Sequence, residues 1–313
     1  MKLAVTFPGQ GSQSVGMGKA LYDTFSEAKA VFDAVDEALG ENLSQTIWDG
    51  PQETLTLTAN AQPALMAVSL AAIRALESKG FSLANQASFV AGHSLGEYSA
   101  LCAAGSISIA DTAKLLRIRG NAMQAAVPAG EGAMAAIIGL ERSDVEAICE
   151  SFAGSGCCQI ANDNGGGQFV ISGSKVEVEA AAEQAKKKGA KRALILPVSA
   201  PFHSALMSPA ADVMKEALEA VEIKAPCVPL ISNVVAGPIS DPDEIRKRLV
   251  EQVTGQVRWA ESVSFMAENG IEALIEAGSG KVLTGLARRI SRDLKGIPVG
   301  TPEDVDKALE ALI

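Results

Sequence analysis

Short apolar runs alternate with longer helical patterns along most of this 313-residue chain. Leu3 to Phe7 is the first such run, closed by a Pro8-Gly9 turn, and Ser88 to Ala91 is another. Asn60 is expected to cap the first of several helices. Helices are expected over 62–79, 94–104 and 110–126, and further strands over 228–232 and 271–276. Strands that alternate with helices favour a parallel sheet with helices on its faces.

The middle of the chain has a different order of elements. Strands are expected over 133–140, 157–161, 168–172 and 193–198. Ser143 and Ser174, each followed three residues later by Glu, predict capping boxes at the starts of two helices between them. The order β-α-β-β-α-β is that of a ferredoxin-like fold. We therefore predict an α/β protein in which 128–198 form a subdomain inserted into a larger domain of 1–127 and 199–313.

Composition excludes several classes of function. The net charge of −10 disfavours binding to nucleic acid or an anionic membrane. No run approaches the ~18 apolar residues of a membrane span, and the N-terminus predicts a strand and turn, not a signal peptide. Five cysteines without a Cys-x-x-Cys pair favour a reducing cytoplasm. With only two histidines, a zinc site is not expected.

The best candidate for a nucleophile is Ser94. Gly92-His93-Ser94-Leu95-Gly96 matches Gly-x-Ser-x-Gly between an apolar strand and a helix. A strained strand-to-helix turn at this point would expose the Ser94 hydroxyl, with glycines where side chains would collide. The positive end of the following helix favours negative charge that develops beside it. The alternative is a Gly/Ser turn met by chance.

A serine nucleophile needs a base, and the two histidines are the candidates. His93 adjoins Ser94, and in such a turn its side chain should point away, which favours a packed or hydrogen-bonded role. His203 remains as the base by elimination. No acidic residue before it stands out as a partner, so a Ser–His dyad is the simpler prediction. A weak dyad favours a thioester substrate, because a thiolate, with a pKa of about 8.5, leaves more readily than an alkoxide.

Several motifs occur along the chain in one order. They are Pro8-Gly9-Gln10-Gly11-Ser12-Gln13, Gln62-Pro63-Ala64, Gly92-His93-Ser94-Leu95-Gly96, Arg119-Gly120, Pro201-Phe202-His203-Ser204 and Gly280-Lys281-Val282-Leu283. Together they closely resemble the malonyl-CoA:acyl carrier protein transacylases of fatty acid synthesis over nearly the whole chain. The resemblance implies an α/β-hydrolase-like core that carries a ferredoxin-like subdomain, in agreement with the pattern of elements.

The resemblance also implies catalytic roles. Ser94 would carry the malonyl group as an ester, and His203 would be the base. The backbone N–H groups of Gln10 and Leu95 would form the oxyanion hole, which suits a residue just after the nucleophile. The main-chain carbonyl of Gln252 would orient His203. No metal or other cofactor is implied, and malonyl-CoA enters as a substrate.

The resemblance assigns substrate binding chiefly to Arg119, which would bind the free carboxylate of the malonyl group. A guanidinium suits this role because it offers two parallel donors in a planar fork. The alternative for Arg119, from the helical pattern alone, is a solvated helix face. Further substrate contacts are expected from Gln62, Met123, Phe202 and Asn162.

The partner implied by the resemblance is an acyl carrier protein, itself expected to be acidic. Lys191, Arg192, Arg288 and Arg289 are basic residues in this acidic chain and are predicted to dock it. For Lys186 to Lys188, a solvated helix end is the favoured role instead.

Two rival functions share these residues. A serine esterase or thioesterase of the same fold would use Ser94 and His203 but would not explain Arg119. A non-enzymatic docking module would not need an intact dyad. One departure from the family stands at Gly278-Ser279-Gly280-Lys281, where relatives usually have proline in place of Ser279.

Overall fold

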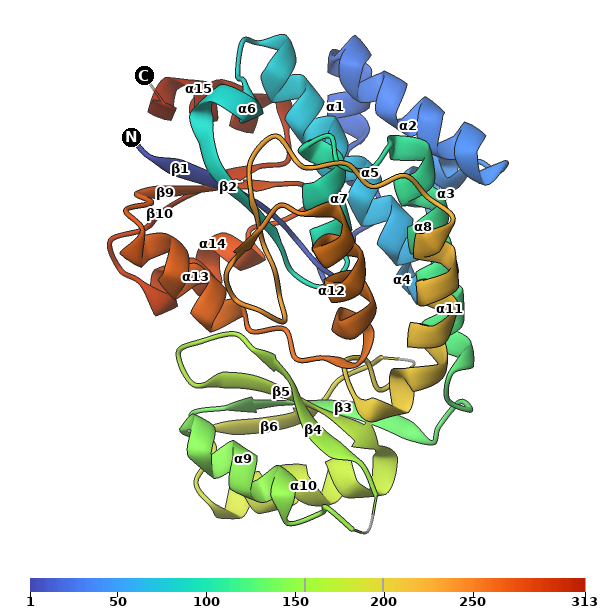
Figure 1. Ribbon diagram of the computed structural model, residues 1–313, viewed down its shortest axis with the longest axis vertical. Coiled ribbons are helices and arrows are strands. Elements are labelled where there is room, and N and C mark those ends of the chain that lie inside the picture. The colour runs from blue at the N-terminus through green and yellow to red at the C-terminus, as the bar shows by residue number, and fades with distance from the viewer. Residues whose placement is uncertain (155, 199, 313) are drawn as a thin grey trace.

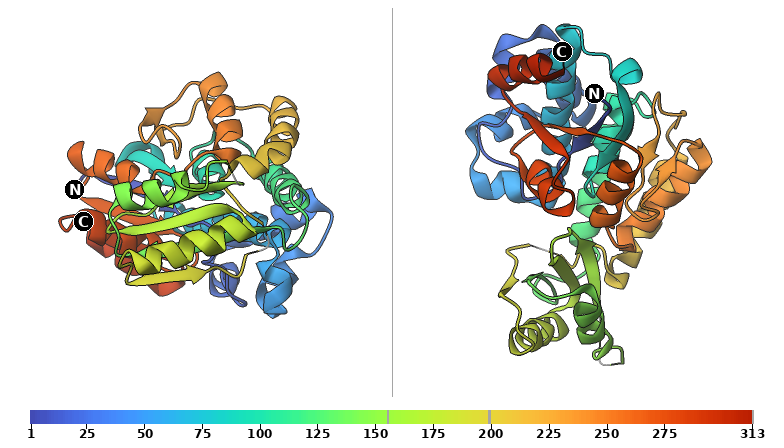
Figure 2. Two further views of the ribbon diagram at one scale, coloured as in Figure 1. Left: turned by 90° about the horizontal axis from the view of Figure 1, so that it is seen from below. Right: turned by 90° about the vertical axis from the view of Figure 1, so that its left-hand side faces the viewer.

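The computed structural model describes residues 1–154, 156–198 and 200–312. Residues 199 and 313, the bounds of the second segment predicted for the larger domain, lie outside that range. Two sheets organise the described chain, a six-stranded sheet in the larger part and a four-stranded sheet in the smaller part (Figure 1). Both termini lie in the larger part, and Figure 2 shows the smaller part projecting from it.

The larger sheet has the strand order β10-β9-β1-β2-β7-β8, and only the β7–β8 pair is antiparallel. Its strands are β1 (Leu3–Phe7), β2 (Ala87–Gly92), β7 (Leu230–Ile231), β8 (Pro238–Ile239), β9 (Ala273–Ala277) and β10 (Lys295–Val299). Side chains alternate across β1, where Val5 and Phe7 face one apolar core and Ala4 faces another. The sheet is therefore buried on both faces, as a parallel sheet requires.

Helices cover both faces of this sheet. On one side lie α1 (Lys19–Thr24), α2 (Ser26–Leu39), α3 (Leu43–Asp49), α4 (Gln52–Thr56), α5 (Thr58–Ser78), α6 (Leu83–Gln86), α7 (Gly96–Ala103), α8 (Ile109–Ala125), α11 (Ser208–Glu219), α12 (Pro242–Thr254) and α15 (Pro302–Leu312). On the other lie α13 (Trp259–Glu268) and α14 (Val282–Ile290). Helix α5 is apolar nearly all round and runs through the core of the larger part.

The smaller sheet has the antiparallel order β4-β5-β3-β6. Its strands are β3 (Gly132–Ile138), β4 (Cys158–Asp163), β5 (Gln168–Ser174) and β6 (Arg192–Ile195), and α9 (Arg142–Glu150) and α10 (Lys175–Lys187) pack on one face. The opposite face is turned toward the larger part, where Met134 joins the larger core. Val257 bridges the parts through backbone hydrogen bonds to β4, from its N–H to Ala161 O at 2.8 Å and from Asp163 N–H to its carbonyl at 3.0 Å.

None of the three predicted capping residues caps its helix through its side chain. Asn60 does not cap a helix, because α5 begins at Thr58 and Asn60 lies within it, donating to Thr54 O. The earlier start places Pro63 inside the helix. Ser143 likewise lies inside α9, which begins at Arg142, so its capping box is wrong. Ser174 does stand at the start of α10, but its hydroxyl accepts a bond from the Cys157 N–H instead of capping the helix.

Strands β6 and β7 differ most from their predicted lengths, since β6 ends at Ile195 and β7 has only two residues. Past Ile195 the chain leaves the sheet toward the cavity described below, and Leu196 is among the residues that line it. The elements without a counterpart in the prediction are helices α1 to α4, α6 and α12 to α14 and strands β8 and β10. None of the helices over the described residues combines the length and apolar character of a membrane span.

Candidate active site

The predicted nucleophile stands on a sharp turn between β2 and α7. Ser94 has a φ of 55°, a left-handed conformation that is strained for a residue with a side chain. The turn is this tight because neither glycine has a side chain. A Cβ on Gly92 would lie 1.9 Å from the Gly96 carbonyl, and a Cβ on Gly96 would lie 2.2 Å from Phe7 O. Only glycine fits both positions, so the motif produces the predicted turn, and the half-buried Ser94 faces the cavity described below.

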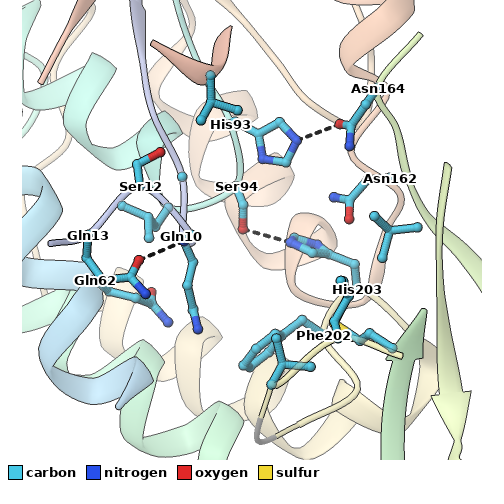
Figure 3. A pocket seen from close by; sticks show the side chains of 18 of the residues that line it. Gln10, Ser12, Gln13, Gln62, His93, Ser94, Asn162, Asn164, Phe202 and His203 are labelled. Atoms are coloured by element: carbon cyan, nitrogen blue, oxygen red, sulfur yellow. Dashed lines mark hydrogen bonds between the residues drawn. The ribbon is translucent and has the colours of Figure 1, made fainter. Parts of the chain in front are cut away.

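His203 meets Ser94 from a separate loop, also at a left-handed φ of 56°. Its Nε2 lies 2.7 Å from Ser94 Oγ, and the two side chains point toward each other in Figure 3. Its Nδ1 lies 2.9 Å from the main-chain carbonyl of Gln252 and 3.1 Å from that of Gly255. These carbonyls accept only from a protonated Nδ1, which leaves Nε2 free to accept the serine proton. Among the described residues, no carboxylate bonds to this imidazole.

The charge state of His203 follows from its surroundings. Its side chain is buried, and burial together with the nearby Arg119 cation lowers the pKa of His203 to about 3. The imidazole is therefore neutral at physiological pH and can act as a base. His93, by contrast, turns away from Ser94, and its Nε2 lies 2.9 Å from Asn164 Oδ1 (Figure 3). Its ring packs against Trp259 with centroids 5.6 Å apart, so His93 has the structural role predicted for it.

Arg119 reaches the same hydroxyl from α8. Its side chain is only 1% exposed, and its Nη2 lies 3.2 Å from Ser94 Oγ. The guanidinium donates to two amide oxygens, to Gln62 Oε1 at 2.7 Å and to Gln252 Oε1 at 2.8 Å. It forms no ion pair with any carboxylate of the described chain, and its Nε has no hydrogen-bond partner there. A solvated helix face, the alternative from the helical pattern, is excluded by this burial.

These residues line a cavity of about 400 Å³ between the two sheets. The predicted site residues in its wall are Gln10, Gln62, Ser94, Leu95, Arg119, Met123, Asn162, Phe202 and His203. Apolar side chains from the smaller sheet, including Met134 and Val170, form the opposite wall. The backbone N–H groups of Gln10 and Leu95 donate to no group of the described chain, which leaves both free for an oxyanion.

Two further residues, which the sequence did not bring to notice, hold the nucleophile turn. Asn233 accepts the Ser94 N–H at 2.8 Å and donates to Gly92 O at 2.7 Å. Glu97 is buried, accepts the Asn233 N–H at 2.8 Å and also accepts from Gln252 Nε2. Burial raises the pKa of Glu97 to about 7. The sequence does carry a signal for Glu97. It is a carboxylate in an otherwise apolar helix just after the nucleophile, and such a residue is seldom buried without specific hydrogen-bond donors.

The predicted docking residues lie outside the cavity. Lys191, Arg192, Arg288 and Arg289 are exposed, and none pairs with an acid within the described residues. Lys186 and Lys188 instead pair with Glu183 and Asp144 at 2.6 and 2.8 Å, as a solvated helix end would. Ser279, at the one departure from the family pattern, ties its loop by donating to Ser12 O at 2.7 Å.

Comparison with known proteins agrees with this geometry. Residues 5–300 match the family model for the acyl transferase domain. The chain is 47% identical over 312 residues to the malonyl CoA-acyl carrier protein transacylase of Bacillus subtilis (strain 168), covering 99% of this chain and 97% of that protein. The crystal structure of an acyl-carrier-protein-S-malonyltransferase from Bartonella henselae superposes with a TM-score of 0.98 at 62% identity, covering 100% and 99% of the two chains.

A third relative was solved together with its partner. It is a malonyl-transacylase in complex with a holo type II PKS acyl-carrier protein, with a TM-score of 0.96 at 42% identity over 99% of this chain and 100% of that one. The likeness covers both sheets and thus the cavity between them. On its sequence and on its fold, this chain belongs to the acyl transferase family of malonyl-CoA:acyl carrier protein transacylases.

Proposed function

We propose that this protein transfers a malonyl group from malonyl-CoA to the phosphopantetheine thiol of an acyl carrier protein, through an ester on Ser94. The position of Ser94 Oγ carries the proposal, since it lies 2.7 Å from His203 Nε2 and 3.2 Å from Arg119 Nη2. A base activates this hydroxyl, and a cation beside it suits an acyl group that ends in a carboxylate. The names of the relatives favour transfer over a serine esterase.

In the first half-reaction, Ser94 Oγ attacks the thioester carbonyl carbon while His203 Nε2 takes its proton. The oxygen of the tetrahedral intermediate is held by the N–H groups of Gln10 and Leu95. The C–S bond then breaks, and the leaving CoA thiolate takes the proton from the imidazolium. The second half-reaction reverses these steps, with the carrier thiol as the nucleophile and Ser94 Oγ as the leaving group.

The main-chain carbonyls of Gln252 and Gly255 take the place of a triad carboxylate. They hold the Nδ1–H tautomer but stabilise the imidazolium less than an anion would. A thiolate leaving group compensates for this. Met123, Phe202 and Asn162 would shape the rest of the malonyl pocket. Every step uses the protein's own groups, so we expect no cofactor, and we expect the reaction to supply fatty acid synthesis in the cytoplasm.

An acidic carrier protein would dock beside the cavity. Two adjoining loops, the one after β3 at Gly139 and the β4–β5 turn at Gly166, bring two of the predicted basic residues to the junction of the two parts. A Cβ on Gly139 would lie 2.7 Å from Lys191 Cγ, and one on Gly166 would lie 3.3 Å from Arg289 Cβ. Helix α14 joins this surface to the site, because Val282 and Leu286 line the cavity and Arg288 and Arg289 end the helix.

The decisive experiment measures the intact mass of the protein after mixing with malonyl-CoA alone. A malonyl adduct is expected, and holo acyl carrier protein should discharge it. Ser94→Ala should form no adduct, whereas Ser99→Ala, at a buried serine on the helix α7 that follows the turn, should form it normally. Accumulation of free malonate without an adduct would indicate a thioesterase. A full transfer rate in Ser94→Ala would contradict the scheme.

A further inference from the structure

Glu97 is a buried carboxylate within the site for which the mechanism above has no use. It lies on α7, three residues after the nucleophile, and is 1% exposed. A buried carboxylate is costly unless strong donors satisfy it. Both of its oxygens are satisfied, Oε1 by the Asn233 N–H at 2.8 Å and Oε2 by Gln252 Nε2. Both neighbours are donors, so a carboxylate, which accepts with both oxygens, fits this position.

The buried cation of the same region is Arg119, whose immediate partners are neutral. Burial lowers the pKa of the Arg119 guanidinium, and the nearby charge of Glu97 opposes that shift. The side-chain amide of Gln252 connects the two groups. Its Oε1 accepts from Arg119 Nη2 at 2.8 Å, and its Nε2 donates to Glu97 Oε2 and to Ser94 O, the latter at 2.9 Å.

The Gln252 amide has two possible orientations, and Glu97 distinguishes them. In the observed one, the amide oxygen meets the guanidinium and the amide N–H meets the carboxylate. A flipped amide would face its N–H donors toward Arg119 and its oxygen toward the carboxylate of Glu97. Both contacts would then be repulsive at a site without water screening. A glutamine at position 97 has only one acceptor oxygen. If that oxygen keeps the Asn233 N–H, its NH2 group faces Gln252 Nε2 and opposes the observed orientation.

We propose that Glu97 is a positioning residue for the selection of acyl groups with a free carboxylate, acting through the Gln252 amide to hold the Arg119 guanidinium beside Ser94. The inference rests on the malonyl transfer proposed above. The intervening amide balances the arginine charge without a direct ion pair. An incoming malonyl carboxylate thus meets a guanidinium whose neighbours are neutral oxygens, which it can displace or join.

The test compares malonyl-CoA with acetyl-CoA, which lacks the free carboxylate. In Glu97→Gln, the ratio of kcat/KM for malonyl-CoA over acetyl-CoA should fall about tenfold or more, as for one lost hydrogen bond to a charged group. The loss should appear mainly as a higher KM for malonyl-CoA. Glu97 also supports the Ser94 turn through Asn233, but both substrates use that turn, so an effect on it cancels in the ratio. Glu276→Gln is the matched control, since Glu276 is equally buried but accepts the Leu283 and Thr284 N–H groups at the start of α14. It should lower stability and keep the ratio.

A double-mutant cycle then asks whether Glu97 acts through Arg119. Arg119→Ala alone should abolish most of the malonyl preference, while Arg117→Ala, on the same helix but paired with Glu41, should keep it. In the Arg119→Ala background, Glu97→Gln should cause no further fall in the ratio. A further tenfold fall in that background would overturn the inference, because Glu97 would then act by another route.

An unchanged ratio in folded Glu97→Gln would also overturn the inference. If that variant does not fold, Glu97→Asp replaces it, since aspartate keeps the charge but withdraws it from Gln252 by one methylene. A smaller fall in the same ratio is expected, and an unchanged ratio would overturn the inference. Failure of the proposed function is distinguishable, because the wild-type protein would then transfer no malonyl group at all.

Discussion

At the scale of single residues, the site combines a strained backbone at Ser94 and at His203 with a neutral imidazole as the base. Ser94 and His203 both have a left-handed φ, and each is held there by bonds to its neighbours. Asn233 fixes the serine N–H, and the Gln252 carbonyl fixes the histidine ring. Burial favours the neutral imidazole, which is the form that accepts a proton. Local geometry and protonation state are thus set before substrate binds.

A pH profile tests the protonation state of His203. With a pKa of about 3, the imidazole stays neutral between pH 6 and pH 5, so the rate of malonyl-Ser94 formation should hardly change. A histidine with the usual pKa of about 6.5 would lose about eightfold over this interval. Glu97, with a pKa of about 7, stays mostly protonated throughout this interval and so does not add a titration of its own. Single-turnover mass spectrometry gives the rate, and circular dichroism controls for unfolding.

The sign of the effect on stability follows from the same lowered pKa. Unfolded protein binds a proton at His203 below about pH 6.5, and folded protein does not until about pH 3. Stability from this group is therefore lost progressively as the pH falls through that window. In the rate experiment, an eightfold fall in malonyl-Ser94 formation between pH 6 and pH 5, in protein that remains folded, would contradict a neutral His203.

At the scale of elements, the nucleophile depends on how closely α7 approaches β1 and β2. The turn from Gly92 to Gly96 has room for no Cβ at either end. The carboxyl ends of parallel strands β1, β2 and β7 bring the Gln10 loop, Ser94 and Asn233 to one edge of the sheet. Sites of open α/β sheets lie at this edge because the loops there converge.

Replacing Gly96 tests this close approach. In Gly96→Ala, the added Cβ would lie 2.2 Å from Phe7 O, so α7 must move away and take the Ser94 turn with it. We expect the malonyl adduct to be lost and the midpoint of urea unfolding to fall. Gly285→Ala is the matched control within α14, where a Cβ meets nothing within 4 Å. It should keep the adduct and gain up to about 1 kcal/mol in unfolding free energy. Normal acylation in Gly96→Ala would refute the steric account.

At the scale of the whole molecule, the active site lies between two parts with separate cores. The larger part supplies Ser94 and Arg119, and the smaller sheet supplies the apolar wall with Met134 and Val170. Exposed basic residues from both parts, Lys191 and Arg289, lie against the adjoining loops at Gly139 and Gly166. The net charge of −10 would repel an acidic carrier, and this local surface would attract it.

Charge reversal tests the docking surface. Lys191→Glu and Arg289→Glu should each slow the discharge of malonyl-Ser94 by acyl carrier protein and leave its formation from malonyl-CoA unchanged. The wild-type discharge rate should fall with added salt, because screening weakens steering. Lys186→Glu is the control, since Lys186 is already paired with Glu183 and should have little effect. A discharge rate that is independent of salt and of these charges would argue against docking at this surface.

Much of the fold and site followed from local sequence. Glycine spacing around Ser94 predicted a turn that sterics enforce, and the scarcity of histidine left His203 as the base. The β-α-β-β-α-β order predicted the smaller antiparallel sheet, and alternating strands and helices predicted the larger parallel one. The capping residues Asn60 and Ser143 were wrong because a helix start depends on tertiary packing as well as on a local motif.

The sequence alone thus determined the residue types, the turn at Ser94 and the order of elements, because these depend on neighbours within a few positions. Only the tertiary structure decided which distant groups meet. Glu97, Asn233 and Gln252 lie up to 155 residues apart along the chain and share one buried hydrogen-bond network. Arg119 illustrates the difference, because its helical pattern permitted a solvated face. Packing of α8 against α5 buried it beside Ser94, where desolvation strengthens the attraction of its charge for the carboxylate that we propose it binds.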